Sequence, residues 1–192
     1  MTLRLFFALQ PAPDQGAALV ERAAPLVAQL QARRMPAENL HATLCFIGAV
    51  APQDLDRLKS AAAAVHAQPA SLRFDTLEYW HKARVLCATA GGGELAAPVR
   101  ALAESLQAAV LEAGFAPDVK PFRAHLTLAR KVPAVRAAQC EWPQPLTPPL
   151  LMRCENFVLM QSRRAESGSM YSVVNSWPLD ADDRDLSTAN IQ

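Results

Sequence analysis

The chain has 192 residues, with 19 Lys and Arg against 18 Asp and Glu, so its formal charge is +1. Hydrophobic residues make up 51% of it and charged residues 19%. This composition is typical of a globular protein and excludes an intrinsically disordered one. The near-zero charge also excludes polybasic binding, in which many phosphates are held at once, while leaving room for a local anion site.

Hydrophobic periodicity predicts mixed strands and helices along the chain. We expect a strand over residues 3–9 and then a helix over 14–32 that Pro25 interrupts or kinks. The later elements, in order, are a linker at 33–36, a strand over 40–47, a helix over 52–68, paired strands over 72–80 and 84–90, a helix over 94–112, a strand over 125–128, a proline-rich connection over 133–149, and a hairpin of 154–161 with 170–177. The polar tail at 180–192 is expected to fray.

The cysteines and the apolar segments indicate the cellular compartment of the protein. The four cysteines are Cys45, Cys87, Cys140 and Cys154. They lack zinc-finger spacing, and a disulfide framework is not expected in a long chain with so few cysteines. The apolar run at 3–9 is cut by Pro11 before it reaches the length of a signal peptide, and no apolar run approaches the ~20 residues of a membrane span. We therefore expect a cytoplasmic protein that does not bind membranes.

Two of the four histidines begin the same short motif. His41-Ala-Thr43-Leu and His125-Leu-Thr127-Leu lie 84 residues apart, each after a predicted helix and a connection. Residues i and i+2 of a strand point to the same side, so each histidine shares a face with its threonine. This weak internal repeat suggests one domain over residues 1–179, made of two similar lobes that each contribute one His-x-Thr strand.

The paired motifs favour acid–base chemistry at phosphorus. If the two strands lie side by side across a pseudo-twofold axis, both imidazoles and both hydroxyls converge on one cavity. Because imidazole titrates near pH 6.5, one ring can accept a proton while the other donates one. The threonine hydroxyls can donate to anionic oxygens between them. One histidine would activate water and the other would protonate the leaving oxygen, with no metal or other cofactor.

Two other interpretations of the motif remain. Each histidine can be an ordinary residue of a half-buried strand, which is the usual explanation for a single His-x-Thr but a poor one for a pair. A zinc site is the third interpretation. It is less favoured because threonine is a poor zinc ligand and neither motif has a third His, Asp or Glu at strand or helix spacing.

The chain resembles the 2H phosphoesterases, and among them the bacterial RNA 2′,3′-cyclic phosphodiesterases, also called 2′-5′ RNA ligases. The resemblance extends over residues 3–179. It rests on RLFFAL at 4–9, NLHATLCFIG at 39–48, FRAHLTLAR at 122–130 and the strand containing SMY at 169–171. It implies an α+β fold of two lobes, in which two antiparallel sheets flank a central cleft and helices lie outside.

The resemblance also implies an activity and a role for each site residue. The activity is hydrolysis of RNA 2′,3′-cyclic phosphate ends to 2′-phosphomonoesters, with His41 as proton donor and His125 as proton acceptor. Thr43 and Thr127 would bind the phosphate oxygens. The residues alone would also allow the two histidines to exchange roles. The partners implied are RNA ends or small oligonucleotides, and we expect a monomer.

Three further residues have two interpretations each. Arg130 follows the second motif and is a candidate phosphate ligand, but strict alternation places it on the face opposite His125, as an ordinary surface arginine. Tyr171 is a candidate substrate contact or a core residue. Trp80 can stack on a base or be a buried aromatic.

Other functions are compatible with the same residues. The alternatives to cyclic phosphate hydrolysis are a 2′-5′ RNA ligase or 2′-5′ phosphodiesterase and a non-catalytic RNA-end binding module. The intact pair of motifs argues against the binding module, because binding alone needs no two titratable groups.

Overall fold

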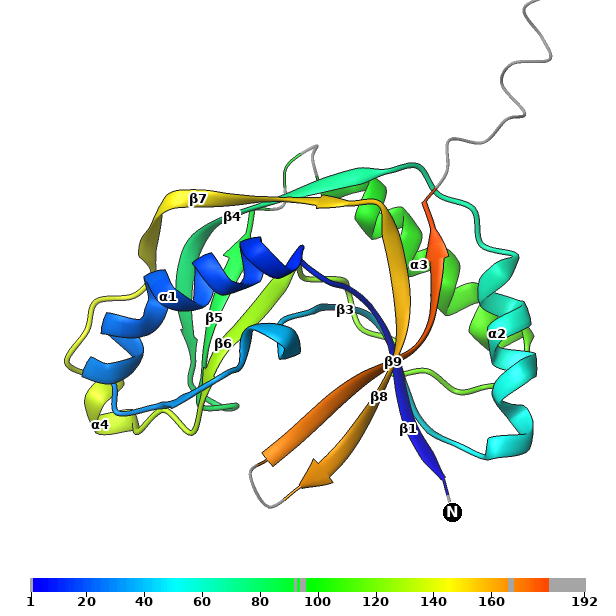
Figure 1. The fold of residues 1–192 in the computed structure, drawn as a ribbon, viewed down its shortest axis with the longest axis horizontal. Coiled ribbons are helices and arrows are strands. Elements are labelled where there is room, and N and C mark those ends of the chain that lie inside the picture. Colours follow the sequence, from blue (N-terminus) through cyan, green and yellow to red (C-terminus); the bar gives the residue numbers. More distant parts are fainter. Residues whose placement is uncertain (1, 92, 94–95, 166–167, 180–192) are drawn as a thin grey trace, which may run out of the picture.

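The protein has two lobes, each built on one antiparallel sheet (Figure 1). The structure, a computed structural model, describes residues 2–91, 93, 96–165 and 168–179. One sheet, here sheet A, has the strand order β3-β1-β8-β9, and sheet B has the order β2-β6-β5-β4-β7. The strands are β1 (Leu3–Leu9), β2 (Arg33–Arg34), β3 (Ala42–Val50), β4 (Ala70–Trp80), β5 (Val85–Ala90), β6 (His125–Arg130), β7 (Gln144–Cys154), β8 (Asn156–Ala165) and β9 (Gly168–Pro178). This is the bilobal α+β fold expected from the sequence.

The helices cover the outer sides of the two lobes. They are α1 (Pro13–Gln29), α2 (Leu55–Ala63), α3 (Ala97–Glu112) and the short α4 (Ala134–Ala137), with single turns η1 (Ala37–Asn39) and η2 (Pro52–Asp54). Helix α1 follows β1 of sheet A but packs on β6 and β7 of sheet B, whereas α3 follows β5 of sheet B and packs on β3 of sheet A (Figure 1). The chain therefore passes between the lobes after each of these strands and ties them together.

Strand β1 is buried on both faces. Leu5, Phe7 and Leu9 are fully buried in the main hydrophobic core, which contains residues of both lobes. On the other face, Phe6 and Ala8 form a separate small cluster with two residues of β8. Burial on both sides explains why residues 5–9 are a continuous apolar run rather than an alternating one. The second cluster forms the apolar floor beneath the site described below.

The proline-rich connection expected at 133–149 is wrong in part, because it contains α4 and the start of β7. Three of its prolines, Pro145, Pro148 and Pro149, lie inside β7. Proline cannot donate a ladder hydrogen bond and is tolerated at a sheet edge. Strand β7 is an edge strand of sheet B, so these prolines are compatible with its extended conformation.

Other elements differ from expectation mainly at their ends. Helix α1 continues through Pro25, whose side chain is exposed. Helix α2 ends at Ala63 rather than near residue 68, and the linker at 33–36 contains the short strand β2. The expected start of α3 at Glu94 and the expected frayed tail at 180–192 lie outside the described residues.

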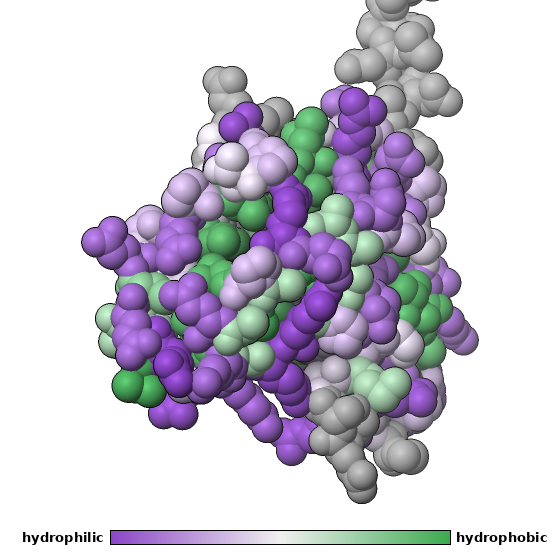
Figure 2. All heavy atoms as spheres, turned by 60° about the vertical axis from the view of Figure 1, so that its left-hand side comes forward, coloured by the Kyte–Doolittle hydropathy of each residue, from purple (hydrophilic) through white to green (hydrophobic). Residues whose placement is uncertain are grey.

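The cysteines and the surface agree with what the sequence composition predicts. All four cysteines are free thiols. No helix among the described residues is long and apolar enough to span a membrane. Hydrophilic side chains dominate the face shown in Figure 2, with smaller hydrophobic areas between them.

Helix α3 ends in a Schellman motif built on Gly114. The Gly114 N–H donates to the Leu111 carbonyl at 2.9 Å, and the Phe115 N–H donates to the Val110 carbonyl at 3.1 Å. These two bonds satisfy carbonyl groups that the end of the helix leaves without partners. Gly114 has φ +82°, a left-handed conformation that glycine adopts without steric cost.

Gly114→Ala is expected to lower the free energy of unfolding by about 1–2 kcal/mol, the cost of a left-handed conformation for an L-residue. Gly91→Ala is the matched control, because a Cβ there meets no atom within 4 Å and no positive φ is required. The measurement is urea denaturation of both variants and the wild type. Equal stabilities of the two variants would contradict this account of the helix end.

Candidate active site

Both His-x-Thr-Leu motifs contain a β-bulge at their leucine. In sheet A, Ala8 pairs with Thr43 and Phe7 with Cys45, so Leu44 is the extra residue of β3. In sheet B, Cys87 pairs with Thr127 and Leu86 with Ala129, which makes Leu128 the extra residue of β6. Both leucines are buried. The two lobes therefore repeat a local backbone irregularity at the same motif position, and bulges re-aim the side chains that follow them.

The bulge in β6 decides where Arg130 lies. Directly paired residues of an antiparallel ladder have side chains on the same face. His125, Thr127 and Arg130 pair with Thr89, Cys87 and Val85, which alternate along β5. The expectation that Arg130 lies opposite His125 is therefore wrong, because strict alternation fails across the extra residue Leu128.

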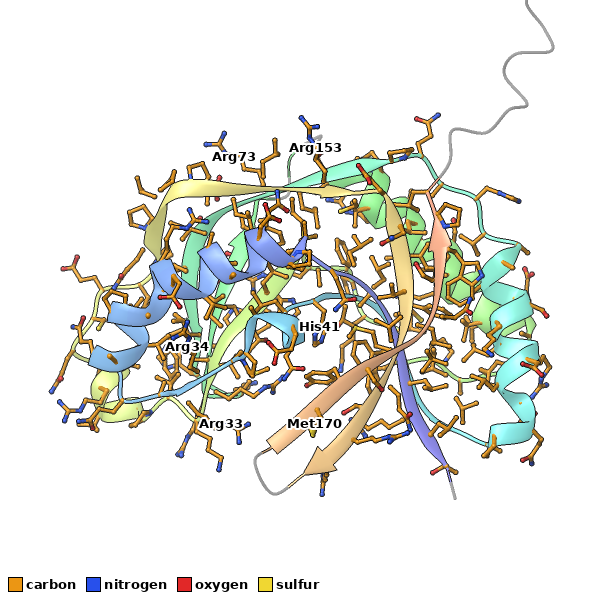
Figure 3. All side chains as sticks on the ribbon, viewed as in Figure 1. Arg33, Arg34, His41, Arg73, Arg153 and Met170 are labelled. Carbon is orange, nitrogen blue, oxygen red and sulfur yellow. The ribbon has the colours of Figure 1, made fainter. Side chains whose placement is uncertain are left out.

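The two motif strands do not pair with each other. Strand β3 is an edge strand of sheet A, and β6 is an inner strand of sheet B between β2 and β5. They lie against each other where the sheets meet. Figure 3 shows His41 between the two lobes. The motifs therefore face one another across the junction of two sheets rather than within one ladder.

Each imidazole is held by the same backbone hydrogen bond. The His41 Nδ1–H donates to the Asn39 carbonyl at 2.7 Å, and the His125 Nδ1–H donates to the Arg123 carbonyl at 2.8 Å. Since a carbonyl can only accept, both rings carry the Nδ1 proton. Their Nε2 atoms are thus acceptors in the neutral ring and donors in the charged ring, which is the requirement for a general base or acid.

The environment favours the neutral form of both histidines. Burial lowers the pKa of His41 to about 4; the hydrogen bond to Asn39 opposes this, and the positive charges of Arg130 and His125 add to it. Burial likewise lowers the pKa of His125, where the carbonyl hydrogen bond opposes the effect and Arg123 and Arg130 add to it. Both side chains are thus within electrostatic reach of Arg130, and without a bound anion the pair is neutral at pH 7.

A cavity of about 270 Å³ adjoins the His41 side of the cleft. It is lined by Arg4, Phe6, His41, Thr43, Phe46, Arg130, Ser162, Ser169 and Tyr171. Four of the six site residues predicted from sequence therefore line one cavity. His125 and Thr127 do not line it; they stand beside it on the face of sheet B that carries Arg130.

Tyr171 joins the two lobes at this cavity. Its ring meets the rings of His41, at 4.7 Å between centroids, and Phe6, at 5.6 Å. Its hydroxyl accepts a hydrogen bond from Arg130 Nη2 at 3.3 Å. The Arg130 Nε is buried, and no group among the described residues accepts a hydrogen bond from it. A buried donor without a partner is costly, and an anion in the cavity would satisfy it.

A second group of side chains supports His125. The Trp80 ring lies 4.5 Å from the His125 ring between centroids, and the Arg123 guanidinium lies over the Trp80 ring, 5.0 Å from its centroid. Glu78 accepts hydrogen bonds from Trp80 Nε1 at 2.9 Å, Thr89 Oγ1 at 3.0 Å and Arg123 Nη2 at 2.5 Å. These donors lower the pKa of Glu78 against the opposing effect of its burial. Trp80 is half-buried against a motif histidine rather than in the core.

Sequence reasoning missed several residues of the site. It assigned no role to Phe6, Arg4 or Glu78, although Glu78-x-Trp80 on a predicted strand places both side chains on one face. Among the described residues, no three His, Cys, Asp or Glu side chains lie close enough together to hold a metal ion. The two histidines outside the motifs, His66 and His81, are exposed.

Comparisons with known proteins found a matching family model and solved structures of similar fold. A sequence model of the 2′-5′ RNA ligase superfamily matches residues 12–166. E. coli LigT, solved with 3′-AMP, has a TM-score of 0.80 at 23% identity, covering 94% of this chain and 100% of that one. A Thermus thermophilus protein has a TM-score of 0.76 at 27% identity, covering 93% of this chain and 99% of that one. No curated protein matches significantly.

An anion in the cavity is expected to raise the pKa of both histidines. In the ligand-free protein the His41 imidazole should be half-protonated near pH 4, and that of His125 below pH 6.5. Sulfate, which stays charged throughout, should move both midpoints upward. The measurement is an NMR titration of the ring signals, assigned with His41→Asn and His125→Asn. A His41 midpoint at or above the ordinary value of 6.5 without sulfate would contradict the geometry.

Proposed function

Because the chain belongs to the 2′-5′ RNA ligase superfamily, we propose that it hydrolyses RNA 2′,3′-cyclic phosphate ends to 2′-phosphomonoesters without a metal. Its partners are RNA ends or small oligonucleotides, and it acts as a cytoplasmic monomer. Residues 1–179 form one catalytic domain in this proposal. The enzyme is an RNA 2′,3′-cyclic 3′-phosphodiesterase.

The observation that carries the proposal is the matched pair of imidazoles. Each donates its Nδ1 proton to a carbonyl two residues earlier in the chain, and each is influenced by the same Arg130. Two rings with equivalent backbone support and Nε2 atoms left for substrate suit paired acid–base catalysis. An ordinary structural histidine needs no such duplicate.

In this mechanism, His125 Nε2 accepts a proton from water, and the water oxygen attacks phosphorus. The bond from phosphorus to the 3′ oxygen breaks, and His41 Nε2 gives its proton to that oxygen. The product carries a 2′-phosphate and a free 3′ hydroxyl. Atoms and charge balance with water as the only co-reactant. At the end of the step His125 carries one more proton than before and His41 carries one fewer.

The surroundings of the two rings support these roles. His41 lines the cavity, so a phosphate bound there raises its pKa most effectively and lets it hold the proton to be donated. Arg123 lies beside His125 and lowers the pKa of that ring, which favours the neutral form that a base requires. Because burial and positive charges lower the pKa of both rings in the free protein, the assignment of donor and acceptor rests on the family resemblance.

The remaining site residues would hold the phosphate. Thr43 and Arg130 line the cavity with His41, and Thr127 lies on the same face of β6 as Arg130. Hydroxyl and guanidinium donors match the non-bridging oxygens as their charge grows during attack. The Arg130 Nε hydrogen has no acceptor within the described part of the chain and suits this purpose, while Tyr171 holds the same guanidinium in place.

A second candidate is 2′-5′ RNA ligation or 2′-5′ phosphodiester cleavage, which the superfamily's description favours. If the attacking oxygen belongs to a 5′ hydroxyl instead of water, the same proton transfers form a 2′-5′ linkage. The reverse reaction then cleaves it. Solved complexes of LigT with 3′-AMP and with ATP support nucleotide binding in a cleft of this kind.

The direct test is incubation with an oligonucleotide bearing a 2′,3′-cyclic phosphate, with EDTA present. We expect a 2′-phosphate product, mapped by nuclease digestion and mass spectrometry, at a rate that chelation leaves unchanged. Complete loss in EDTA with rescue by Zn²⁺ or Mn²⁺ would favour a metal site instead. A 2′-5′-linked product from added 5′-hydroxyl RNA would favour the second candidate.

His41→Ala and His125→Ala are each expected to lower kcat by about 10²–10⁴, the usual contribution of a general acid or base. His81→Ala is the matched control, because His81 is exposed on the turn between β4 and β5. The measurement is single-turnover cleavage, with circular dichroism to verify folding. A folded variant of either motif histidine with a normal rate would remove that residue from the mechanism.

The pH dependence is expected to differ between free protein and complex. Since both pKa values lie below 6.5 in the free protein, the protonated donor is lost early as pH rises. The basic limb of kcat/KM should therefore fall below pH 6.5, while the bound anion moves the basic limb of kcat to higher pH. Single-turnover rates from about pH 4 to 9 provide both. Coincident basic limbs would contradict this electrostatic account.

A further inference from the structure

We infer that the Arg4 end of the active-site cavity binds a second phosphate, the phosphodiester on the 5′ side of the terminal nucleotide. This inference rests on the proposed function and specifies its substrate as an RNA chain rather than a free cyclic mononucleotide. The residues of this subsite, here the Arg4 subsite, are Arg4, Phe46, Ser162 and Ser169.

The charges in the cavity exceed what one substrate phosphate needs. A cyclic phosphodiester carries one negative charge, and Arg130 already stands beside the two histidines to meet it. Arg4 adds a second guanidinium to the lining of the same cavity. Within the part of the chain that the structure describes, neither arginine forms an ion pair with a carboxylate. An additional anionic group would balance this charge.

The pairing of the strands places the Arg4 subsite on the same face of sheet A as the residues that contact His41. Arg4 and Phe6 lie on one face of β1, and Arg4 pairs with Ser162 of β8, which pairs with Tyr171 of β9. A bulge at Ile47 also pairs Phe46 with Phe6, so the Phe46 ring joins this face instead of the opposite one. The face that meets His41 through Phe6 and Tyr171 therefore continues directly to Arg4.

The spacing fits consecutive phosphates. Phe6 contacts the His41 ring, with 4.9 Å between ring centroids. Arg4 is two residues further along β1, which corresponds to about 7 Å on an extended strand. Consecutive phosphorus atoms of a nucleic acid strand have a similar separation. When the cyclic phosphate lies at the histidines, the preceding phosphate falls within reach of the long Arg4 side chain.

The chemistry of the Arg4 subsite favours a phosphate over a base. The Arg4 guanidinium lies over the Phe46 ring, 4.7 Å from its centroid, so this ring face is occupied and cannot stack a nucleobase. The same contact orients the guanidinium. The serine hydroxyls and the outward N–H groups of Arg4 are donors suited to phosphate oxygens.

The test compares three substrates: adenosine 2′,3′-cyclic phosphate, its 5′-phosphorylated form, and the dinucleotide ApA with a terminal 2′,3′-cyclic phosphate. We expect kcat/KM to be about 10-fold or more higher for the latter two, the effect of a hydrogen bond to a charged group. Arg4→Gln should lower kcat/KM for the latter two substrates by about this factor more than for the simple cyclic nucleotide, so that the preference is lost. The matched control is Arg153→Gln, because Arg153 lies on the opposite edge of the molecule from the β8–β9 hairpin and away from His41 (Figure 3).

The outcomes separate this inference from the proposed function. No cleavage of any of the three substrates would contradict the proposed function itself. Cleavage of all three at equal efficiency, or an unchanged preference in Arg4→Gln, would contradict the Arg4 subsite alone. A preference for the dinucleotide without one for the 5′-phosphorylated mononucleotide would show that a nucleoside, not a phosphate, is recognised, and would also overturn it.

Discussion

The site depends on one interaction made twice: a histidine Nδ1–H that donates to the backbone carbonyl two residues before it. Each bond fixes the ring's orientation and its tautomer together, so the Nε2 atoms are left for chemistry. The carbonyls belong to Asn39 and Arg123, which lie just before the two motif strands. The positions of the two Nε2 atoms are therefore set by the backbone where each strand begins, and only secondarily by neighbouring side chains.

The β-bulges at Leu44 and Leu128 set which face of each strand the residues after the motif occupy. In each motif the leucine is itself the extra residue of the bulge. It is buried, and the residues after it change face. In β6 the result is that Arg130 joins His125 and Thr127, and the three can act on one anion. Burial of both imidazoles then keeps them neutral until an anion arrives, since desolvation is the main cause of their lowered pKa values. In the proposed mechanism, the charge of the substrate raises the pKa of one ring and lets it act as an acid.

Much of this could be predicted from the sequence, because the repeated His-x-Thr-Leu motif and its helices are local signals. His41 and Thr43 followed from the motif, whereas the two-sheet fold and the candidates Arg130 and Tyr171 came from the resemblance to the 2H phosphoesterases. The face of Arg130 could not be predicted, since a bulge depends on pairing with β5, which is distant in the chain. Strand β7 was missed because its prolines are acceptable only at an edge, and strand order is a tertiary property. The support of His125 by Glu78 and Trp80 likewise requires β4 and β5 to lie beside β6.

The central claim is that the two histidines act as one unit on one phosphorus atom. It is tested most directly by comparing the single-turnover rate of the double variant His41→Ala/His125→Ala with the rates of the two single variants on the same cyclic phosphate oligonucleotide. Residues that act together are strongly non-additive. We predict that the double variant is about as slow as the slower single variant. Losses that multiply, as for two independent sites, would contradict the claim.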